Sequence, residues 1–193
     1  MNPKKLAFYL WLLLITGGVT AYFIFPDEIN ILFLEELSDE YHYIALSIYF
    51  LLLSARGLTM IPSTPLLLAG VLIFDPLELF FVNMAGILSS STIVYYFSKY
   101  LGFDLYFETK YGKYVQKIKR GITDKELPVI VGWSFFPLVP TDLIVYVGSS
   151  LRIPVLKCLM GVFMGESVLN AFYIFFDDFD PEALKLELTW VIL

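Results

Sequence analysis

The stretch Ile61-Pro-Ser-Thr-Pro-Leu-Leu-Leu-Ala-Gly70 decides the fold, because it places two prolines inside a long apolar segment. A later apolar segment, Pro137-Leu-Val-Pro-Thr-Asp142, repeats the same Pro-x-x-Pro spacing. Proline lacks a backbone donor and ends a helix, so each stretch predicts a break between two short helices. At membrane depth, broken backbone is tolerated only where protein or water surrounds it. Both breaks are therefore expected to face the inside of the protein.

The composition is that of an integral membrane protein. Of the 193 residues, 58% are hydrophobic and only 17% are charged, whereas about 25% are charged in an ordinary soluble domain. Apolar runs over 6–25, 79–98 and 155–176 approach the roughly 20 residues that cross a bilayer. We therefore expect an all-α membrane protein with about three full spanning helices. No small-residue cleavage pattern follows the first run, so it is expected to be a retained helix and not a secretory signal.

Several enzyme and metal classes have no support in the sequence. The single Cys158 cannot form an internal disulfide, and one Cys with one His cannot build a metal site. No G-x-S-x-G or H-E-x-x-H motif occurs, and neither Asp75 nor Asp142 lies in a Gly-x-Gly-Asp setting. We expect no enzyme activity, no catalytic residue, no cofactor and no metal.

The charges are unevenly distributed and predict the topology. Lys4 and Lys5 precede the first apolar run, and the loop expected over 26–40 carries only acidic charges. The connection over 99–126 is mainly basic, with Lys99, Lys110, Lys113, Lys117, Lys119, Arg120 and Lys125. The positive-inside rule then predicts a cytoplasmic amino terminus, and we expect a multi-pass protein of the cell (plasma) membrane. Aromatic and aliphatic residues between the lysines of 110–120 suggest contact with an anionic leaflet, not with nucleic acid.

The same topology turns the two broken segments into hairpins. If the helix over 79–98 begins outside and ends inside, then 41–74 must enter and leave on the outer side. Likewise 127–153 must enter and leave on the inner side. We therefore predict two re-entrant helical hairpins in an inverted-topology repeat; a plain spanning helix over 41–61 with kinks is the alternative. The domains expected are 1–40 (first helix and acidic loop), 41–176 (inverted repeat) and 177–193 (acidic and apolar tail).

Residues about 50–176 resemble a known family. The carriers of the resemblance are Ile61 to Gly70, Tyr96-Phe-Ser-Lys-Tyr-Leu-Gly102, Pro137 to Gly148, Arg152-Ile-Pro154, Gly161 and Gly165. They are similar to the DedA/VTT superfamily, most of all to its SNARE-associated Golgi protein branch. The resemblance implies two facing hairpins that move phospholipids or polyprenyl phosphates between leaflets, sometimes coupled to an ion gradient. Ser134 and Val145 stand where that family usually has Arg and Asn, so an anionic headgroup would need another cation, such as Arg56 or Arg152.

Charged groups inside membrane segments are costly and are candidates for function. Arg56 would hold a lipid phosphate or snorkel to an interface. Asp142, which matches an acidic residue of the family, would couple protons or cap a half-helix. Glu166 needs a cavity or Arg56 as its partner. Hydroxyls and amides where the half-helices begin could bind an anion. The predicted lipid path comprises Arg56, Pro62, Ser63, Thr64, Pro65, Pro137, Pro140, Thr141, Asp142, Tyr146, Arg152 and Glu166.

The function predicted first is a scramblase-like or flippase-like transporter of lipids or lipid-linked phosphates. An ion-coupled transporter of small solutes and a non-transporting assembly or trafficking factor are the alternatives. The assembly factor would need the loops and could lose the buried charges, whereas a transporter needs the buried charges. The partners expected are membrane lipids, phospholipid or polyprenyl phosphate, and no nucleic acid; a homo-oligomer is left open.

Overall fold

The computed structural model describes residues 6, 8–13, 16–17, 20, 31–137 and 139–175. Within these ranges the chain is all-helical and contains no strand. The helices are α2 (Ile31–Arg56), α3 (Thr64–Val71), α4 (Pro76–Leu101), α5 (Phe103–Ile122), α6 (Glu126–Ser134), α7 (Thr141–Ser150) and α8 (Val155–Phe175). The tail over 177–193 and most of the first predicted helix over 6–25 lie outside the described residues.

Among the described helices, two, α4 and α8, are long and apolar enough to cross a membrane. With 26 and 21 residues, they are about 39 and about 32 Å long, against a hydrocarbon core of about 30 Å. The turn Asp75-Pro76 starts α4, and Gly102 ends it with a φ of 77°, a left-handed conformation that glycine adopts without strain. The helices predicted over 79–98 and 155–176 are therefore confirmed as helices.

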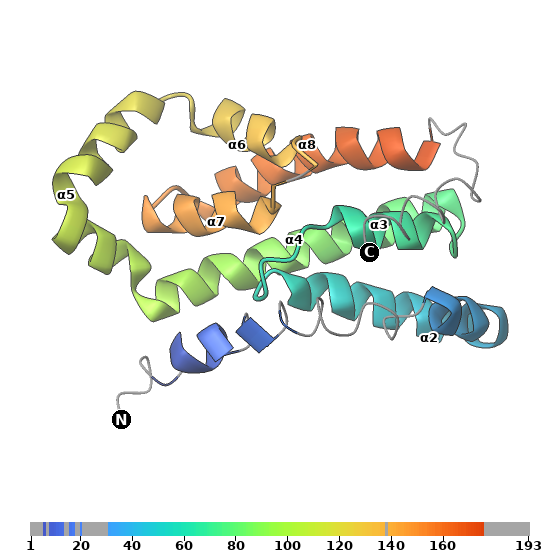
Figure 1. Cartoon of the computed structure of the whole chain (residues 1–193). Coiled ribbons are helices and arrows are strands. Elements are labelled where there is room, and N and C mark those ends of the chain that lie inside the picture. Colours follow the sequence, from blue (N-terminus) through green and yellow to red (C-terminus); the bar gives the residue numbers. More distant parts are fainter. Residues whose placement is uncertain are drawn as a thin grey trace.

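The remaining apolar helices are interrupted at the predicted places. The first break separates α2 from α3 and contains Pro62, while Pro65 lies in the first turn of α3. The second break separates α6 from α7 and contains Pro137 and Pro140. In Figure 1, α2 and α3 lie along one half of α4, α7 lies along the other half, α6 lies on α8, and the two breaks face each other near the middle.

One predicted loop is partly helical. The acidic loop was expected over 26–40, but α2 already begins at Ile31 and includes residues 31–40. The expectation of a loop is therefore wrong for that part. The segment Ile31-Leu-Phe-Leu-Glu-Glu-Leu37 is rich in good helix formers, which explains the earlier start. A kink at Tyr41, with φ −139° and ψ 60°, lies where the loop was expected to end.

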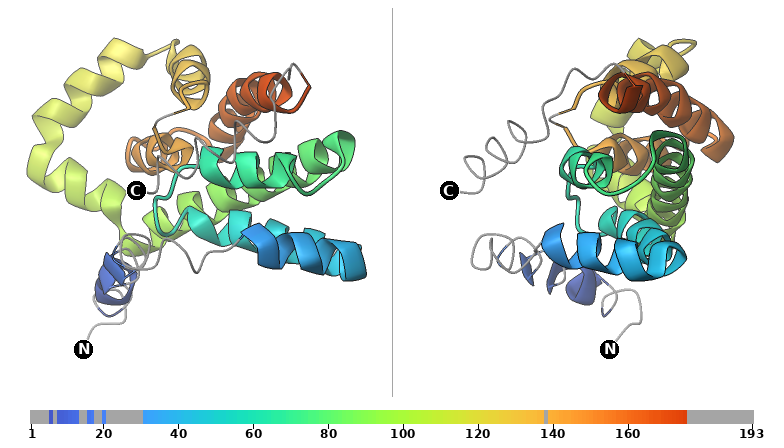
Figure 2. Two further views of the ribbon diagram at one scale, coloured as in Figure 1. Left: turned by 45° about the vertical axis from the view of Figure 1, so that its right-hand side comes forward. Right: turned by 90° about the vertical axis from the view of Figure 1, so that its right-hand side faces the viewer.

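Small residues let neighbouring helices pack closely. The helix α2 packs along α4, α6 packs along α8, and α7 packs against α4, as Figure 2 shows from two further sides. A Cβ on Gly165 of α8 would lie 2.6 Å from the carbonyl oxygen of Val131, and one on Gly86 of α4 would lie 2.6 Å from Leu53. These close approaches show that Gly165 of Gly161-x-x-x-Gly165 and Gly86 of Gly86-x-x-x-Ser90 let the helices pack closely.

The apolar core forms two clusters. One includes Tyr49, Leu53 and Leu79 at the α2 and α3 end, and the other includes Ile87 and Val145 toward α6 and α7. Buried polar side chains collect between and beside these clusters, on α2, α4, α7 and α8. The fold thus brings polar groups from four helices to the level of the two breaks.

Candidate functional site

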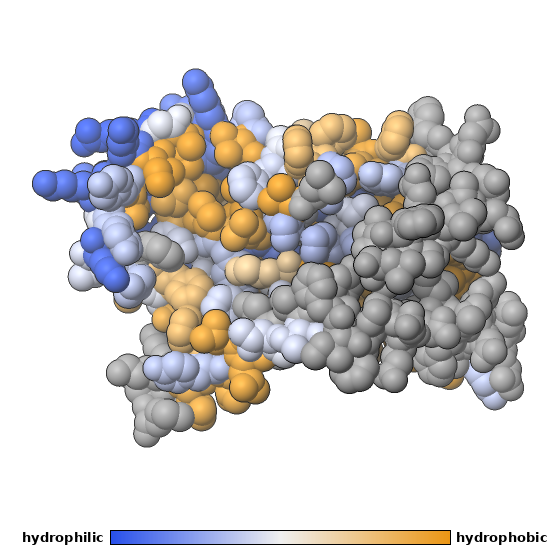
Figure 3. Space-filling model, viewed as in Figure 1, coloured by the Kyte–Doolittle hydropathy of each residue, from blue (hydrophilic) through white to orange (hydrophobic). Residues whose placement is uncertain are grey.

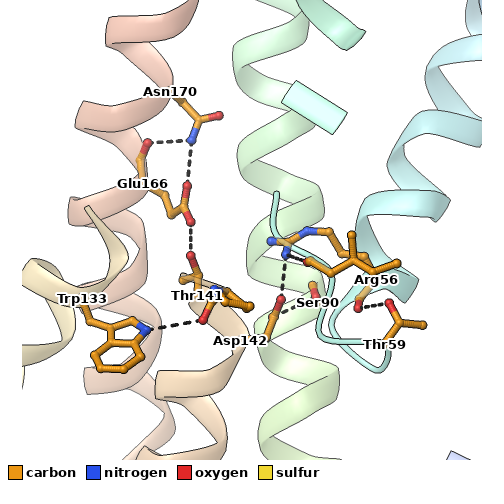
Figure 4. Close-up of polar contacts among 10 residues, drawn as sticks. Arg56, Thr59, Ser90, Trp133, Thr141, Asp142, Glu166 and Asn170 are labelled. Atoms are coloured by element: carbon orange, nitrogen blue, oxygen red, sulfur yellow. Dashed lines mark hydrogen bonds and ion pairs between the residues drawn. The ribbon is translucent and has the colours of Figure 1, made fainter. Parts of the chain in front are cut away.

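A buried ion pair connects the two breaks. Arg56, the last residue of α2, is only 3% exposed. Its Nη1 donates to Asp142 Oδ2 at 2.8 Å and to the carbonyl oxygen of Ile61 at 3.0 Å. Asp142 is fully buried at the start of α7, and its Oδ1 accepts a hydrogen bond from the Ser90 hydroxyl of α4 at 3.0 Å. Figure 4 shows Arg56 and Asp142 pointing toward each other beside α4.

The Arg56 guanidinium uses only part of its hydrogen-bonding capacity. Its Nε and Nη2 atoms are buried and have no hydrogen-bond partner within the described ranges. Leaving a buried donor unpaired costs about 1–3 kcal/mol, and more when the group is charged. The Nε and Nη2 edge is a planar fork that fits two oxygens of a phosphate or carboxylate. Arg56 is therefore buried and paired, not snorkelling, and one edge of its guanidinium has no hydrogen-bond partner among the described residues.

A second polar cluster surrounds Glu166. This α8 side chain is 1% exposed. One of its carboxylate oxygens contacts the Thr141 hydroxyl, and the other accepts a hydrogen bond from Asn170 Nδ2 at 3.0 Å. Asn170 Oδ1 accepts from Asn83 Nδ2 of α4, and Asn83 Oδ1 lies 2.8 Å from the Tyr49 hydroxyl of α2. This chain of hydrogen bonds joins four helices through their interiors.

The first turn of α7 belongs to both clusters. Thr141 contacts Glu166, while the next residue, Asp142, contacts Arg56 (Figure 4). Helix capping by Asp142 does not occur, because Pro140 is the N-cap residue of α7 and makes no side-chain cap. Glu166 does not take Arg56 as an ion-pair partner, since that position is filled by Asp142. The two carboxylates therefore have separate neighbours but share one helical turn.

The two breaks form the tips of the helix pairs α2–α3 and α6–α7, and these tips touch each other directly. The Thr64 hydroxyl at the start of α3 donates to the carbonyl oxygen of Pro137 at 2.9 Å. The indole of Trp133 donates to the carbonyl oxygen of Pro140 at 3.4 Å. Ser63 is buried beside this contact. Most of the predicted path residues thus meet at the two breaks, including Pro62, Ser63, Thr64, Pro65, Pro137, Pro140, Thr141 and Asp142.

Two predicted path residues have other surroundings. Arg152, in the turn between α7 and α8, has a φ of 62° and forms ion pairs with Glu108 at 2.7 Å and Asp104 at 3.3 Å. It therefore belongs to a contact with α5. The Tyr146 ring of α7 packs against Trp11 with 5.8 Å between centroids. Its hydroxyl is buried without a hydrogen-bond partner among the residues described.

Sequence reasoning missed the uncharged members of the site. Tyr49, Asn83, Ser90 and Asn170 complete the two clusters, but the prediction considered mainly charged residues and the breaks. An Asn in the middle of an apolar helix is itself a signal, because its amide needs a partner once it leaves water. Asn83 and Asn170 could have been found on that ground.

No curated protein and no solved structure is significantly similar to this chain. The family model described as the VTT domain matches residues 61–179. That range contains both tips and all of α3 to α8, and it covers more than half of the 193 residues. The chain therefore belongs to the VTT domain family of membrane proteins, in the DedA/VTT superfamily.

Proposed function

We propose that this protein moves lipids or lipid-linked phosphates between the two leaflets of its membrane. The observation that carries the proposal is the Arg56 guanidinium, which is buried where the two breaks meet and whose Nε and Nη2 edge has no hydrogen-bond partner among the residues that the structure describes. An ionisable group at membrane depth is a candidate for function by default. A phosphate with two free oxygens matches this fork.

The proposed topology gives the lipid a route. We propose that α2 and α3 form a hairpin entering from the outer side, that α6 and α7 form one from the cytoplasmic side, and that the amino terminus is cytoplasmic. The packing supports an inverted repeat, because each hairpin places its first helix on the spanning helix that follows it, α2 on α4 and α6 on α8. The headgroup passes between the hairpin tips, while the acyl chains stay in the bilayer.

Passage of a headgroup requires the tips to separate. The contacts that must open are the hydrogen bond from Thr64 to Pro137 and the ion pair between Arg56 and Asp142. Only Nη1 of Arg56 is used by Asp142 and Ile61, so we propose that a phosphate binds the Nε and Nη2 edge once the tips have separated. Binding the phosphate then weakens the hold of Arg56 on Asp142, because the cation is shared between two anions.

One observation favours ion coupling as a second candidate. Glu166 has hydrogen-bond partners but no ion-pair partner in the part of the chain that the structure describes. A buried carboxyl group of this kind can exchange a proton during transport. In an ion-coupled solute transporter Glu166 would likewise exchange a proton, but the protein would not move lipid.

The test is a lipid translocation assay with the purified protein in vesicles. Dithionite reduces a fluorescent lipid only in the outer leaflet unless the protein moves it across. The proposal predicts extra quenching with wild type and a loss of that quenching with Glu166→Gln. Quenching that is unchanged in Glu166→Gln would keep lipid movement and remove Glu166 from it. No extra quenching with phospholipids, and no transfer of a polyprenyl phosphate, would overturn the proposal.

A further inference from the structure

The helix α5 lies outside the helical bundle. It follows α4 directly through Gly102, whose φ of 77° turns the chain away from the axis of α4. A second change of direction occurs at Tyr111, with φ −129° and ψ 29°. Figures 1 and 2 show α5 as an arc beyond the end of α4, on the way to α6. A helix in this position begins where a spanning helix leaves the membrane.

The second half of α5 has two different faces. Lys113 and Lys117 are one helical turn apart on one face, while Tyr114 and Ile118 are likewise one turn apart on the neighbouring face, about 100° further round the helix. Val115 is buried against the bundle, but Tyr114 is 71% and Ile118 is 50% exposed. This half of the helix is therefore amphipathic, and its apolar face is only partly covered by the protein.

The positive charge of α5 is not neutralised within the described protein. Its acidic residues, Asp104 and Glu108, are taken up by Arg152. A hydrogen bond to the Tyr106 hydroxyl raises the pKa of Lys110, which therefore stays charged. The other basic residues have no ion-pair partner in the described ranges; they are Lys113, Lys117, Lys119 and Arg120. In Figure 3 hydrophilic atoms gather at the α5 end of the molecule, next to hydrophobic ones.

We infer that α5 is an interfacial helix that binds the anionic lipids of the leaflet at the end of α4. Exposed tyrosine and isoleucine beside a row of lysines suit the boundary between headgroups and acyl chains. Anionic headgroups attract lysine and arginine close to the surface. An acidic protein or a nucleic acid would match the charge but would leave Tyr114 and Ile118 in water. The inference is independent of lipid movement through the hairpins.

The test measures which lipids surround α5 in the full-length protein. A bimane probe is attached to the cysteine of Ile118→Cys. The native Cys158 is buried and should not react with the probe. Treating the unsubstituted protein with the same probe checks this. The bilayer contains a minor fraction of phosphatidylglycerol in phosphatidylcholine, with brominated acyl chains on one lipid or the other. The inference predicts that brominated phosphatidylglycerol quenches the probe more than its mole fraction explains. The enrichment should fall at high salt and drop about fivefold for each basic residue removed.

A matched pair of variants shows whether α5 itself is responsible. Lys113→Gln with Lys117→Gln removes two charges from the exposed basic face. The control, Lys99→Gln with Lys157→Gln, also removes two charges. Lys99 lies over the Tyr95 ring, and Lys157 forms an ion pair with Glu126. Only the first pair should lose the enrichment. Equal effects of both pairs, quenching in proportion to mole fraction, or a probe reached by aqueous iodide and not by brominated chains would each overturn the inference.

Discussion

At the scale of single residues, Arg56 forms one ion pair, with Asp142, and part of its guanidinium has no hydrogen-bond partner among the described residues. Its ion pair with Asp142 is buried on both sides, so removing either partner leaves an unpaired charge. We expect Arg56→Leu to lower the free energy of unfolding by about 3–5 kcal/mol. Unfolding of the purified protein in a denaturant titration, followed by its helical signal, measures this.

The double variant Arg56→Leu with Asp142→Leu is the control for that prediction. Replacing both partners by apolar side chains removes the unpaired charge and should restore most of the stability, while lipid movement stays lost. A double variant as unstable as the single ones would show that the ion pair is not the cause of the loss.

The sequence was enough to select the buried charged residues, but it was not enough to tell in which direction their side chains point. Arg56, Asp142 and Glu166 could be selected because charges are rare in apolar helices. The sequence could not decide which carboxylate pairs with Arg56, because that depends on the way in which each helix face turns. In the structure the first turn of α7 directs Asp142 to Arg56 and Thr141 to Glu166.

At the scale of helices, the interruption of α2–α3 and α6–α7 follows from the prolines and was predictable. The start of α2 at Ile31 was not, because acidic residues suggested a loop although Leu and Glu favour a helix. The close packing of α6 on α8 could be expected from Gly161 and Gly165. The structure was needed to show which face of α6 packs on Gly161 and Gly165.

Two glycine substitutions test that helix pair. We expect Gly165→Ala to cost about 1–3 kcal/mol of unfolding free energy, because the added methyl group would lie 2.6 Å from the Val131 carbonyl oxygen. Gly132→Ala on α6 meets no atom within 4 Å and should be neutral or stabilise by up to about 1 kcal/mol. Thermal unfolding of both variants in the same detergent compares them, and equal losses would contradict the close packing.

At the scale of the whole molecule, the proposed hairpins make a topological prediction. Tyr41 and Asp75 should lie on one side of the membrane and Asp124 on the other. In the proposed arrangement α2 and α3 return to the side from which they entered, while α4 crosses. A plain spanning helix over 41–61 would instead separate Tyr41 from Asp75.

Cysteine accessibility in intact cells measures this arrangement. A membrane-impermeant thiol reagent should label Tyr41→Cys and Asp75→Cys from outside, and Asp124→Cys only after permeabilisation. Labelling of Asp75→Cys and Asp124→Cys from opposite sides, with Tyr41→Cys on the side of Asp124, would contradict the first hairpin.

The most direct test of the account is lipid translocation by Arg56→Lys in reconstituted vesicles. Lysine keeps the charge beside Asp142 but lacks the planar fork. Gly132→Ala on α6, where the added methyl group meets no atom within 4 Å, leaves the fork intact and is the control. We predict a folded Arg56→Lys protein that moves the fluorescent lipid about tenfold or more slowly, the effect of losing one charged hydrogen bond, and Gly132→Ala close to wild type. A folded Arg56→Lys protein with the wild-type rate would contradict a headgroup site at Arg56.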